Sequence, residues 1–371
     1  MIKITDNSKC CGCGACENIC PKHCISMQFR DDGFRYPVVD SSLCIDCNLC
    51  EAICPELKNE HPKHMPLKTL GGRAIKQETV EHSTSGGICQ VLSEYFLNNS
   101  GVVYGAAYAE YFNVRHIRVC DAEHLNAIRN SKYLQSDLSG VLRLVRQDLK
   151  DGLNVLFIGT PCQIAGLKAY LKKDYSNLYT IDFVCHGVPS QKVFNLTTAQ
   201  LQRRYGRLQD LNFRHKNPNW RGYALKYDFE NASFSVPHCK SWFLRGFVSN
   251  LYLRPSCHTC NYNNHKSYAD ITVADLWGVE FCRPELDDNT GLNLIMPRNE
   301  KGIYLLGKID SSITLFDYDY TDALKYNPGI EHAPQRHVLS PIFPVLQSFL
   351  PVNGAIAISL ALGRIAHKLF H

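Results

Sequence analysis

Thiols are the most chemically suggestive side chains in this sequence, because 18 of its 371 residues are cysteine and many of them cluster near the N-terminus. Disulfides would need an oxidising compartment. The opening residues MIKITDNSK are not followed by an apolar segment of the kind that directs export, so we expect a reducing, cytoplasmic location. In such a compartment clustered cysteines usually bind metal.

Two runs of four cysteines share one register, with two, two and three residues between successive thiols and a proline after the last. This spacing is typical of bacterial ferredoxins, where each [4Fe–4S] cluster takes three thiolates from one run and the last from the other. Zinc, the alternative, is usually held by two pairs of ligands. The expected ligands are Cys10, Cys13, Cys16 and Cys54 for one cluster, and Cys44, Cys47, Cys50 and Cys20 for the other.

A second group of thiols follows strand patterns further along the chain. Cys162 comes after NVLFIG, and Cys185 comes directly after LYTIDFV. Ligands of open α/β sheets gather at the carboxyl ends of parallel strands, so neighbouring strands would bring these two thiols into one crevice. Cys257 and Cys260 have the two-residue gap of a chelating loop. The four thiols could hold a third cluster, or Cys162 and Cys185 could be core residues beside a zinc-binding or unused pair.

The remaining cysteines fit neither group. Cys11 and Cys24 lie outside the ferredoxin register, and we expect them to have no role in it. The others are isolated in the sequence, and free cysteines of this kind usually pack in the core. They are Cys89, Cys120, Cys239 and Cys282.

Two further stretches could bind anions. STSGG at Ser83–Gly87 is a small-residue turn before an amphipathic helix pattern, where glycine backbones allow a phosphate or flavin to approach and a helix start favours anions. Turns of this composition also occur without a cofactor. In FRHKNPNWRG, Arg214, Lys216 and Trp220 could hold an acidic substrate, although a solvated surface is the commoner explanation for such residues.

The thiols need a scaffold, and the pattern of the sequence predicts one. Between the N-terminal runs, ISMQFRDDGFRYPVVD predicts two short strands around a turn at Asp32–Gly33. After a polar segment with two prolines, strand and helix patterns alternate as far as about residue 205. This alternation predicts an α/β domain with a parallel sheet.

Composition limits the classes of partner. A net charge of +5 permits anionic cofactors, but the basic stretches are short and we expect no nucleic acid. No run approaches the roughly 20 apolar residues of a membrane span. The tail GAIAISLALGRIAHKLFH at 354–371 predicts an apolar helix with a basic end, which could touch a membrane surface. We expect it instead to dock on the core.

Several motifs, taken in order, resemble those of the coenzyme F-420 hydrogenase/dehydrogenase beta-subunit family, here preceded by a two-cluster ferredoxin module. The resemblance runs from about residue 1 to residue 345. The motifs are STSGG at 83–87, NSKYLQS at 130–136, GTPCQIAGL at 159–167, CHGVPS at 185–190, LRPSCHTCNY at 253–262 and ADITVADLWG at 269–278.

The resemblance implies FAD and one [4Fe–4S] cluster in the catalytic domain. It favours Cys162, Cys185, Cys257 and Cys260 as ligands of that cluster, with the fourth ligand not matched across the family. It also implies that Ser85, Gly86 and Gly87 line the flavin and that Lys132 and Tyr133 contact its phosphates and ring. The expected parts are a ferredoxin domain at 1–58, a linker at 59–72, a flavin-binding part at 73–150, a catalytic part at 151–345 and a helical tail at 346–371.

We therefore expect an α+β ferredoxin-like two-cluster module followed by an α/β flavin-binding catalytic domain. The resemblance implies an iron–sulfur flavoprotein oxidoreductase that passes electrons between clusters and FAD, in either direction, for a small-molecule acceptor. Relatives act on coenzyme F-420 or tetrapyrroles, or occur with genes for cell-surface polysaccharides. An electron donor or acceptor protein is the expected partner. The alternative is a non-catalytic electron-transfer subunit of a partner enzyme.

Overall fold

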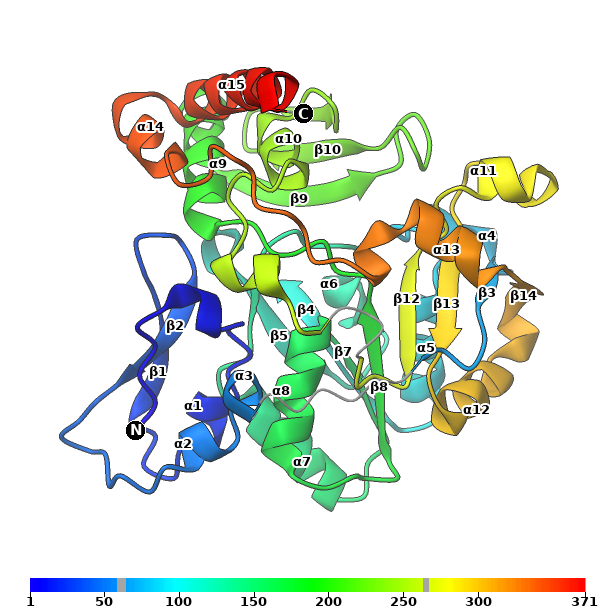
Figure 1. Cartoon of the computed structure of the whole chain (residues 1–371). Coiled ribbons are helices and arrows are strands. Elements are labelled where there is room, and N and C mark those ends of the chain that lie inside the picture. Colours follow the sequence, from blue (N-terminus) through cyan, green and yellow to red (C-terminus); the bar gives the residue numbers. More distant parts are fainter. Residues whose placement is uncertain (59–64, 263–266, 371) are drawn as a thin grey trace.

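The fold begins with a cysteine-rich module that wraps a two-stranded sheet. A computed structural model describes residues 1–58, 65–262 and 267–370 of the chain. Strands β1 (Ile25–Phe29) and β2 (Arg35–Val39) pair antiparallel, and Gly33 takes the left-handed conformation that their connecting turn requires. The predicted hairpin is therefore confirmed (Figure 1).

A nine-stranded mixed sheet forms the centre of the larger part of the chain. Its order is β14-β3-β13-β12-β8-β7-β4-β5-β6, and the four central strands β12, β8, β7 and β4 run parallel. The predicted α/β architecture is thus confirmed. The strands are β3 (Leu70–Ala74), β4 (Val102–Tyr108), β5 (Val114–Val119), β6 (Ser136–Asp137), β7 (Val155–Ile158), β8 (Leu178–Phe183), β12 (Ile271–Asp275), β13 (Asn293–Pro297) and β14 (Ile313–Asp317).

Helices cover both faces of this sheet (Figure 1). Because side chains alternate along a strand, Tyr104 and Phe157 pack beneath α7 (Val141–Lys150) and α8 (Pro161–Leu171) on one face. Neighbouring residues of the same strands, such as Leu156, point to the opposite face. There they pack under α5 (Ile88–Asn98) and α12 (Glu300–Lys308).

A second antiparallel sheet rises beside the strand ends (Figure 1). Its strands are β9 (Leu208–His215), β10 (Ala224–Phe229) and β11 (Ser233–Pro237). Four helices share its apolar core, and they are α9 (Gln191–Tyr205), α10 (Trp242–Val248), α14 (Phe343–Phe349) and α15 (Val352–Phe370).

The tail helix α15 docks on the core as expected, because Val352, Ala355, Ile356 and Leu360 are buried against this cluster. Its opposite face exposes apolar side chains such as Leu362. Within the described ranges, no helix combines the length and the apolar character needed to cross a bilayer.

Short helices complete the chain between these elements. In the expected linker, residues 59–64 lie outside the described residues, and β3 already begins at Leu70. The short α-helices are α1 (Ala15–Ile19), α2 (Leu49–Ala52), α3 (Pro55–Lys58), α4 (Gln77–Glu81), α6 (Leu125–Ile128), α11 (Val279–Cys282) and α13 (Tyr320–Tyr326). The 3-10 turns include η1 (Asn7–Lys9), η2 (Glu110–Phe112), η3 (Pro255–Thr259), η5 (Pro284–Leu286), η6 (Asp310–Ser312) and η7 (Pro328–Ile330).

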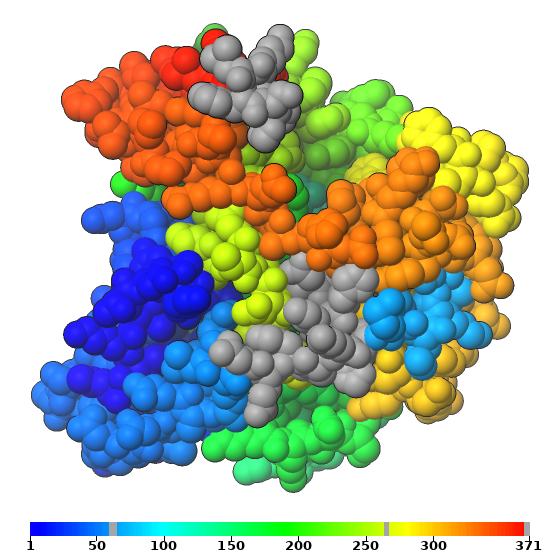
Figure 2. Space-filling view, viewed as in Figure 1, coloured from blue at the N-terminus to red at the C-terminus, as the bar shows by residue number. Residues whose placement is uncertain are grey.

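The N-terminal module is packed directly on the α/β domain. Helix α1 contacts α7 and α8, and Cys11, Cys13 and Ile53 join the apolar core on that face of the sheet. Figure 2 shows the blue module directly against the green and yellow-green segments. The two parts approach each other closely at Gly166 of α8, where an added Cβ would lie 2.6 Å from the Cβ of Cys13.

Gly166→Ala should therefore destabilise the protein although alanine favours helices. The added methyl overpacks the contact with Cys13, which costs about 1–3 kcal/mol and exceeds the gain in helix propensity of about 1 kcal/mol. The matched control is Gly307→Ala in α12, where an added Cβ meets no atom of the described residues within 4 Å. Thermal unfolding should show a lower midpoint for Gly166→Ala and an equal or higher one for Gly307→Ala. An unchanged Gly166→Ala midpoint would contradict the tight docking.

Candidate functional site

A cavity of about 530 Å³ opens at the carboxyl ends of the parallel strands. Its volume falls within the roughly 300–1,000 Å³ typical of small-molecule sites. The turns after β7, β8 and β12 line it, together with the start of α5, residues from β9 and α10, and Tyr223, which directly precedes β10. Most of its accessible lining is apolar, as is usual for ligand pockets.

The four thiols proposed for a third cluster all line this cavity. Strands β7 and β8 are parallel neighbours, as expected, so the turns that carry Cys162 and Cys185 lie side by side. Cys162 belongs to the first turn of α8, which a capping box of Thr160 and Gln163 fixes in place. Cys257 reaches the same cavity from η3, accompanied by the following thiol of the chelating pair, Cys260.

Burial sets the electrostatics of these thiols. It raises the pKa of Cys257 to about 12 and the pKa values of Cys185 and Cys260 well above their usual value. Hydrogen bonding, first with Cys11, instead lowers the pKa of Cys162. An unpartnered thiolate would be costly here, whereas coordination to a metal deprotonates a thiol outright.

Cys11 has a position that its place in the sequence does not indicate. Its buried thiol is within hydrogen-bonding reach of both Cys13 and Cys162, so it joins the two groups of cysteines. Cys11 thus lies outside the ferredoxin register, as expected, but next to both groups of thiols. Nothing in its spacing could have revealed this contact, which depends on how the two parts of the chain dock.

The N-terminal thiols are grouped as the ferredoxin register predicts. Cys16 interacts electrostatically with Cys10, Cys13 and Cys54, so the last thiol of the second run does lie beside the first run. A separate small cavity is lined by the other four thiols and by Cys24, whose sulfur lies 3.3 Å from that of Cys20. The four ligands predicted for that site are Cys20, Cys44, Cys47 and Cys50.

No group of three or more His, Cys, Asp or Glu side chains in the described ranges is arranged to hold a single metal ion. The thiols of a cubane cluster bind four different irons and need not converge on one point. Of the isolated cysteines, Cys120 and Cys239 are exposed rather than packed in the core.

One fully buried arginine links the two groups of thiols. Arg254 precedes the chelating pair, and its Nε donates to the carbonyl of Cys10 at 2.7 Å. Its Nη1 and Nη2 donate to Gln135 Oε1 at 2.8 Å and to the carbonyl of Arg35 at 3.0 Å. The guanidinium also lies 4.4 Å from the ring centroid of Tyr36. Each nitrogen of this guanidinium thus donates a hydrogen bond, and two of the three bonds cross the interface with the N-terminal module.

Four of the five predicted flavin residues line the cavity, namely Ser85, Gly87, Lys132 and Tyr133. Gly86 is not among its lining residues. An added Cβ there would lie 2.8 Å from the carbonyl oxygen of Gly72 and 2.9 Å from the backbone of Asn293, so close packing between strands explains this glycine. The Ser85 hydroxyl is also used within the protein, because it donates to the carbonyl of Leu292 at 2.6 Å.

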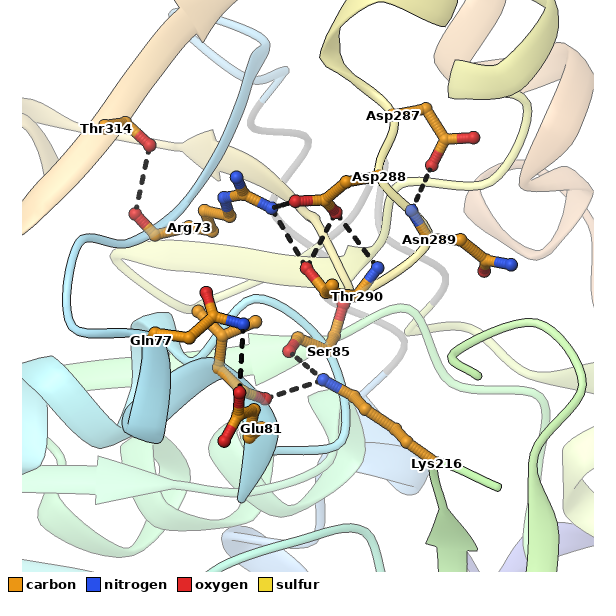
Figure 3. Close-up of polar contacts among 11 residues, drawn as sticks. Arg73, Gln77, Glu81, Ser85, Lys216, Asp287, Asp288, Asn289, Thr290 and Thr314 are labelled. Carbon is orange, nitrogen blue, oxygen red and sulfur yellow. Dashed lines mark hydrogen bonds and ion pairs between the residues drawn. The ribbon is translucent and has the colours of Figure 1, made fainter. Parts of the chain in front are cut away.

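Lys216 holds the small-residue turn in place (Figure 3). Its Nζ donates to the carbonyls of Val80 and Ser85 at 2.6 and 2.9 Å, and burial lowers its pKa to about 8. Above Ser85 in the same view, Arg73 pairs with Asp288 (Figure 3). The prediction that Lys216 contacts an acidic substrate therefore gives way to a structural role.

Trp220 also differs from the prediction. It is fully buried and stacks on Trp277 with ring centroids 4.9 Å apart, so it is a core residue. Arg214 by contrast lines the cavity. Its Nη1 donates to Asp275 Oδ2 at 2.9 Å and to the Tyr133 hydroxyl at 3.2 Å.

Lys132 contributes a second cation to the cavity wall. Its Nζ donates to the carbonyl of Arg129 at 2.8 Å and lies 5.3 Å from the ring centroid of Tyr108. Burial lowers the pKa of this lysine to about 8 because the ammonium loses much of its hydration. Its charge therefore changes close to physiological pH.

Comparisons with known proteins bear on both parts of the chain. Residues 152–318 match the family described as the C terminus of the coenzyme F420 hydrogenase/dehydrogenase beta subunit, and residues 9–57 match the 4Fe–4S dicluster domain. The stretches at 83–87 and 130–136 lie outside both matches. No curated protein matches the chain in sequence.

A chain of the xenon-derivatised F420-reducing [NiFe] hydrogenase complex from Methanosarcina barkeri is similar at 16% identity and a TM-score of 0.49. The similarity covers 78% of this chain and 94% of that one. The dicluster match covers the two cysteine runs, and the beta-subunit match covers the four motifs that lie between residues 159 and 278. The chain thus joins an N-terminal 4Fe–4S dicluster domain to a region of the coenzyme F420 hydrogenase/dehydrogenase beta-subunit family.

Proposed function

We propose that this chain is an iron–sulfur flavoprotein oxidoreductase that passes electrons between [4Fe–4S] clusters and FAD. Its substrate is a small molecule that enters the cavity at the strand ends, and the resemblance suggests cell-surface polysaccharide synthesis as its setting. The observation that carries the proposal is the meeting of thiols from both parts of the chain. Cys11 of the dicluster domain reaches Cys162 in the wall of the cavity that Lys132 and Tyr133 also line.

The residues present fit the groups that the proposal requires. The dicluster domain offers eight thiols in register, and Cys162, Cys185, Cys257 and Cys260 offer four more around one cavity. When bound, [4Fe–4S] clusters transfer single electrons, and a flavin exchanges electron pairs or hydride with its substrate. The chain itself contributes the thiolates, the apolar cavity wall and the buried cations.

Arg254 supports the proposal electrostatically. Its guanidinium is fully buried and interacts with the thiols of Cys10, Cys11 and Cys257, so it lies between the two thiol groups. A positive charge at low dielectric favours added negative charge nearby. This cation would make it easier to reduce a cluster bound at either group of thiols. Its hydrogen bonds would also keep the distance between the two groups fixed.

The exposed edge of the dicluster domain supports a protein partner for electron exchange. Cys47 is exposed, and Leu43 and Ile45 beside it are 54% and 57% exposed. A small apolar surface around a ligand thiol suits a transient redox contact. This observation also favours the alternative, in which the chain is a non-catalytic electron-transfer subunit. The 530 Å³ cavity favours the enzyme.

Anaerobic purification tests the proposal through iron, sulfide and flavin content. The wild type should carry about twelve iron atoms per chain, four for each of three clusters, together with FAD. Cys162→Ala should fall to about eight iron atoms and should accept electrons from a low-potential donor more slowly, with FAD still bound. Cys239→Ala is the control, because Cys239 is exposed and outside both groups. Retention of the full iron content in Cys162→Ala would contradict its role as a ligand.

The pH dependence of FAD binding tests Lys132. Because burial lowers its pKa to about 8, the ammonium is present below that pH and is lost as the pH rises through it. Loss of one charge-assisted contact should weaken FAD binding roughly tenfold between about pH 7 and pH 9. Lys132→Met should bind weakly at both pH values, whereas Lys132→Arg, which stays charged, should show no such fall. Flavin fluorescence measures the dissociation constant. Equal pH profiles for the wild type and Lys132→Met would refute the contact.

A further inference from the structure

We propose that Arg214 is the recognition group for an anion that presents two oxygens side by side, either a carboxylate or a phosphate. The inference deepens the proposed function, on which it rests in treating this cavity as the reaction site. It concerns what the cavity binds and not how electrons reach it.

The guanidinium of Arg214 is only half used by the protein. The residue is 5% exposed and lines the cavity. Its Nη1 bonds to Asp275 and Tyr133, but its Nε and Nη2 have no hydrogen-bond partner among the described residues although both are buried. A buried charged donor without a partner destabilises the folded state, so two such donors on one residue need an explanation.

The two free donors lie on one edge of the guanidinium. Nε–H and Nη2–H point in parallel from this edge, which is the geometry that binds carboxylate or phosphate through two hydrogen bonds. The edge cannot swing away, because Asp275 and Tyr133 hold the opposite side. The guanidinium carbon also lies 4.1 Å from the ring centroid of Tyr223 and 5.4 Å from that of Trp277. Arg214 is therefore preorganised to receive a ligand.

Charge in the cavity favours an anion. The cationic lining residues are Arg129, Lys132 and Arg214, and the acidic ones are Glu56 and Asp275. Asp275 is already paired with Arg214 and accepts from Trp220 Nε1 at 3.4 Å. Asp275 therefore occupies only Nη1 of Arg214, and the edge formed by Nε and Nη2 is the proposed binding face for the anion.

The position of this face relates the anion to the thiols. Asp275 ends β12, and Cys185 follows β8, which is the parallel neighbour of β12. The register pairs Val273 with Phe183, so Asp275 and Cys185 lie at equivalent positions on adjacent strands. Strands in a sheet are about 4.8 Å apart. Arg214 is thus bonded to a residue on the strand next to the one that a proposed cluster ligand follows.

Two sources could supply such an anion: the phosphates of the flavin, or an acidic substrate. The test uses inorganic phosphate and pyrophosphate as probes, with the full chain as isolated and after removal of its flavin. Tryptophan fluorescence reports binding, since Trp277 lies against Arg214. All variants carry Trp242→Phe to remove the remaining tryptophan outside the stacked pair.

We expect saturable binding of at least one probe to the reference protein, and binding about tenfold to a hundredfold weaker in Arg214→Gln. Arg214→Lys keeps the charge but loses the two-donor edge, and should weaken binding by a smaller factor. Asp275→Asn removes a competing negative charge and should tighten it. Arg207→Gln is the control, because its side chain is 77% exposed at the start of β9. Equal melting temperatures of the Arg214 variants would exclude misfolding as the cause.

The outcomes separate the two sources. Loss of flavin from Arg214→Gln at unchanged iron content, with probe binding only to flavin-free protein, identifies the flavin phosphates. Retained flavin, with probe binding to the loaded protein, identifies an acidic substrate. Equal affinities in the reference protein, Arg214→Gln and Asp275→Asn, or no binding in either state, would overturn the inference. Absence of iron and flavin would refute the proposed function alone, because the titration still reports on Arg214.

Discussion

The docking of the dicluster domain depends on a guanidinium buried where three segments meet. Arg254 donates to backbone carbonyls of Cys10 and Arg35 and to Gln135, and it has no exposed surface. Removing a charge from water costs several kcal/mol unless its hydrogen bonds are replaced. Here every edge is bonded, so the cation is tolerated only while both parts of the chain are in place. The interface is thereby specified by polar contacts as well as by packing.

This constraint explains why thiols from distant parts of the sequence meet. Holding Cys10 against Arg254 places the next residue, Cys11, beside Cys162, and Cys13 packs closely against Gly166 of α8. Electron transfer within a fixed pair of sites does not wait for two molecules to collide. The fused dicluster domain would then act as a permanent neighbour of the cavity, in keeping with the proposed function.

The parts of the fold and of the candidate site that depend on residues close in sequence could be predicted. The ferredoxin register, the hairpin around Asp32–Gly33 and the strand-then-thiol pattern at Cys162 and Cys185 all follow from residues close in sequence. The contact of Cys11 and the role of Arg254 did not, because both depend on docking between segments far apart in the sequence. The role of Gly86 was also ambiguous in the sequence, because glycine is used both where a turn approaches a cofactor and where a residue packs tightly against strands.

The buried cations show how the satisfaction of donors distinguishes structural residues from those that await a ligand. Arg254 is bonded on every edge and needs nothing further. Lys216 likewise donates from its ammonium to two backbone carbonyls, those of Val80 and Ser85, which lie before α5. Arg214 is also buried and lines the cavity, but its Nε and Nη2 have no hydrogen-bond partner among the described residues. Since folding alone would favour pairing or removing those donors, their retention is best explained by a bound anion.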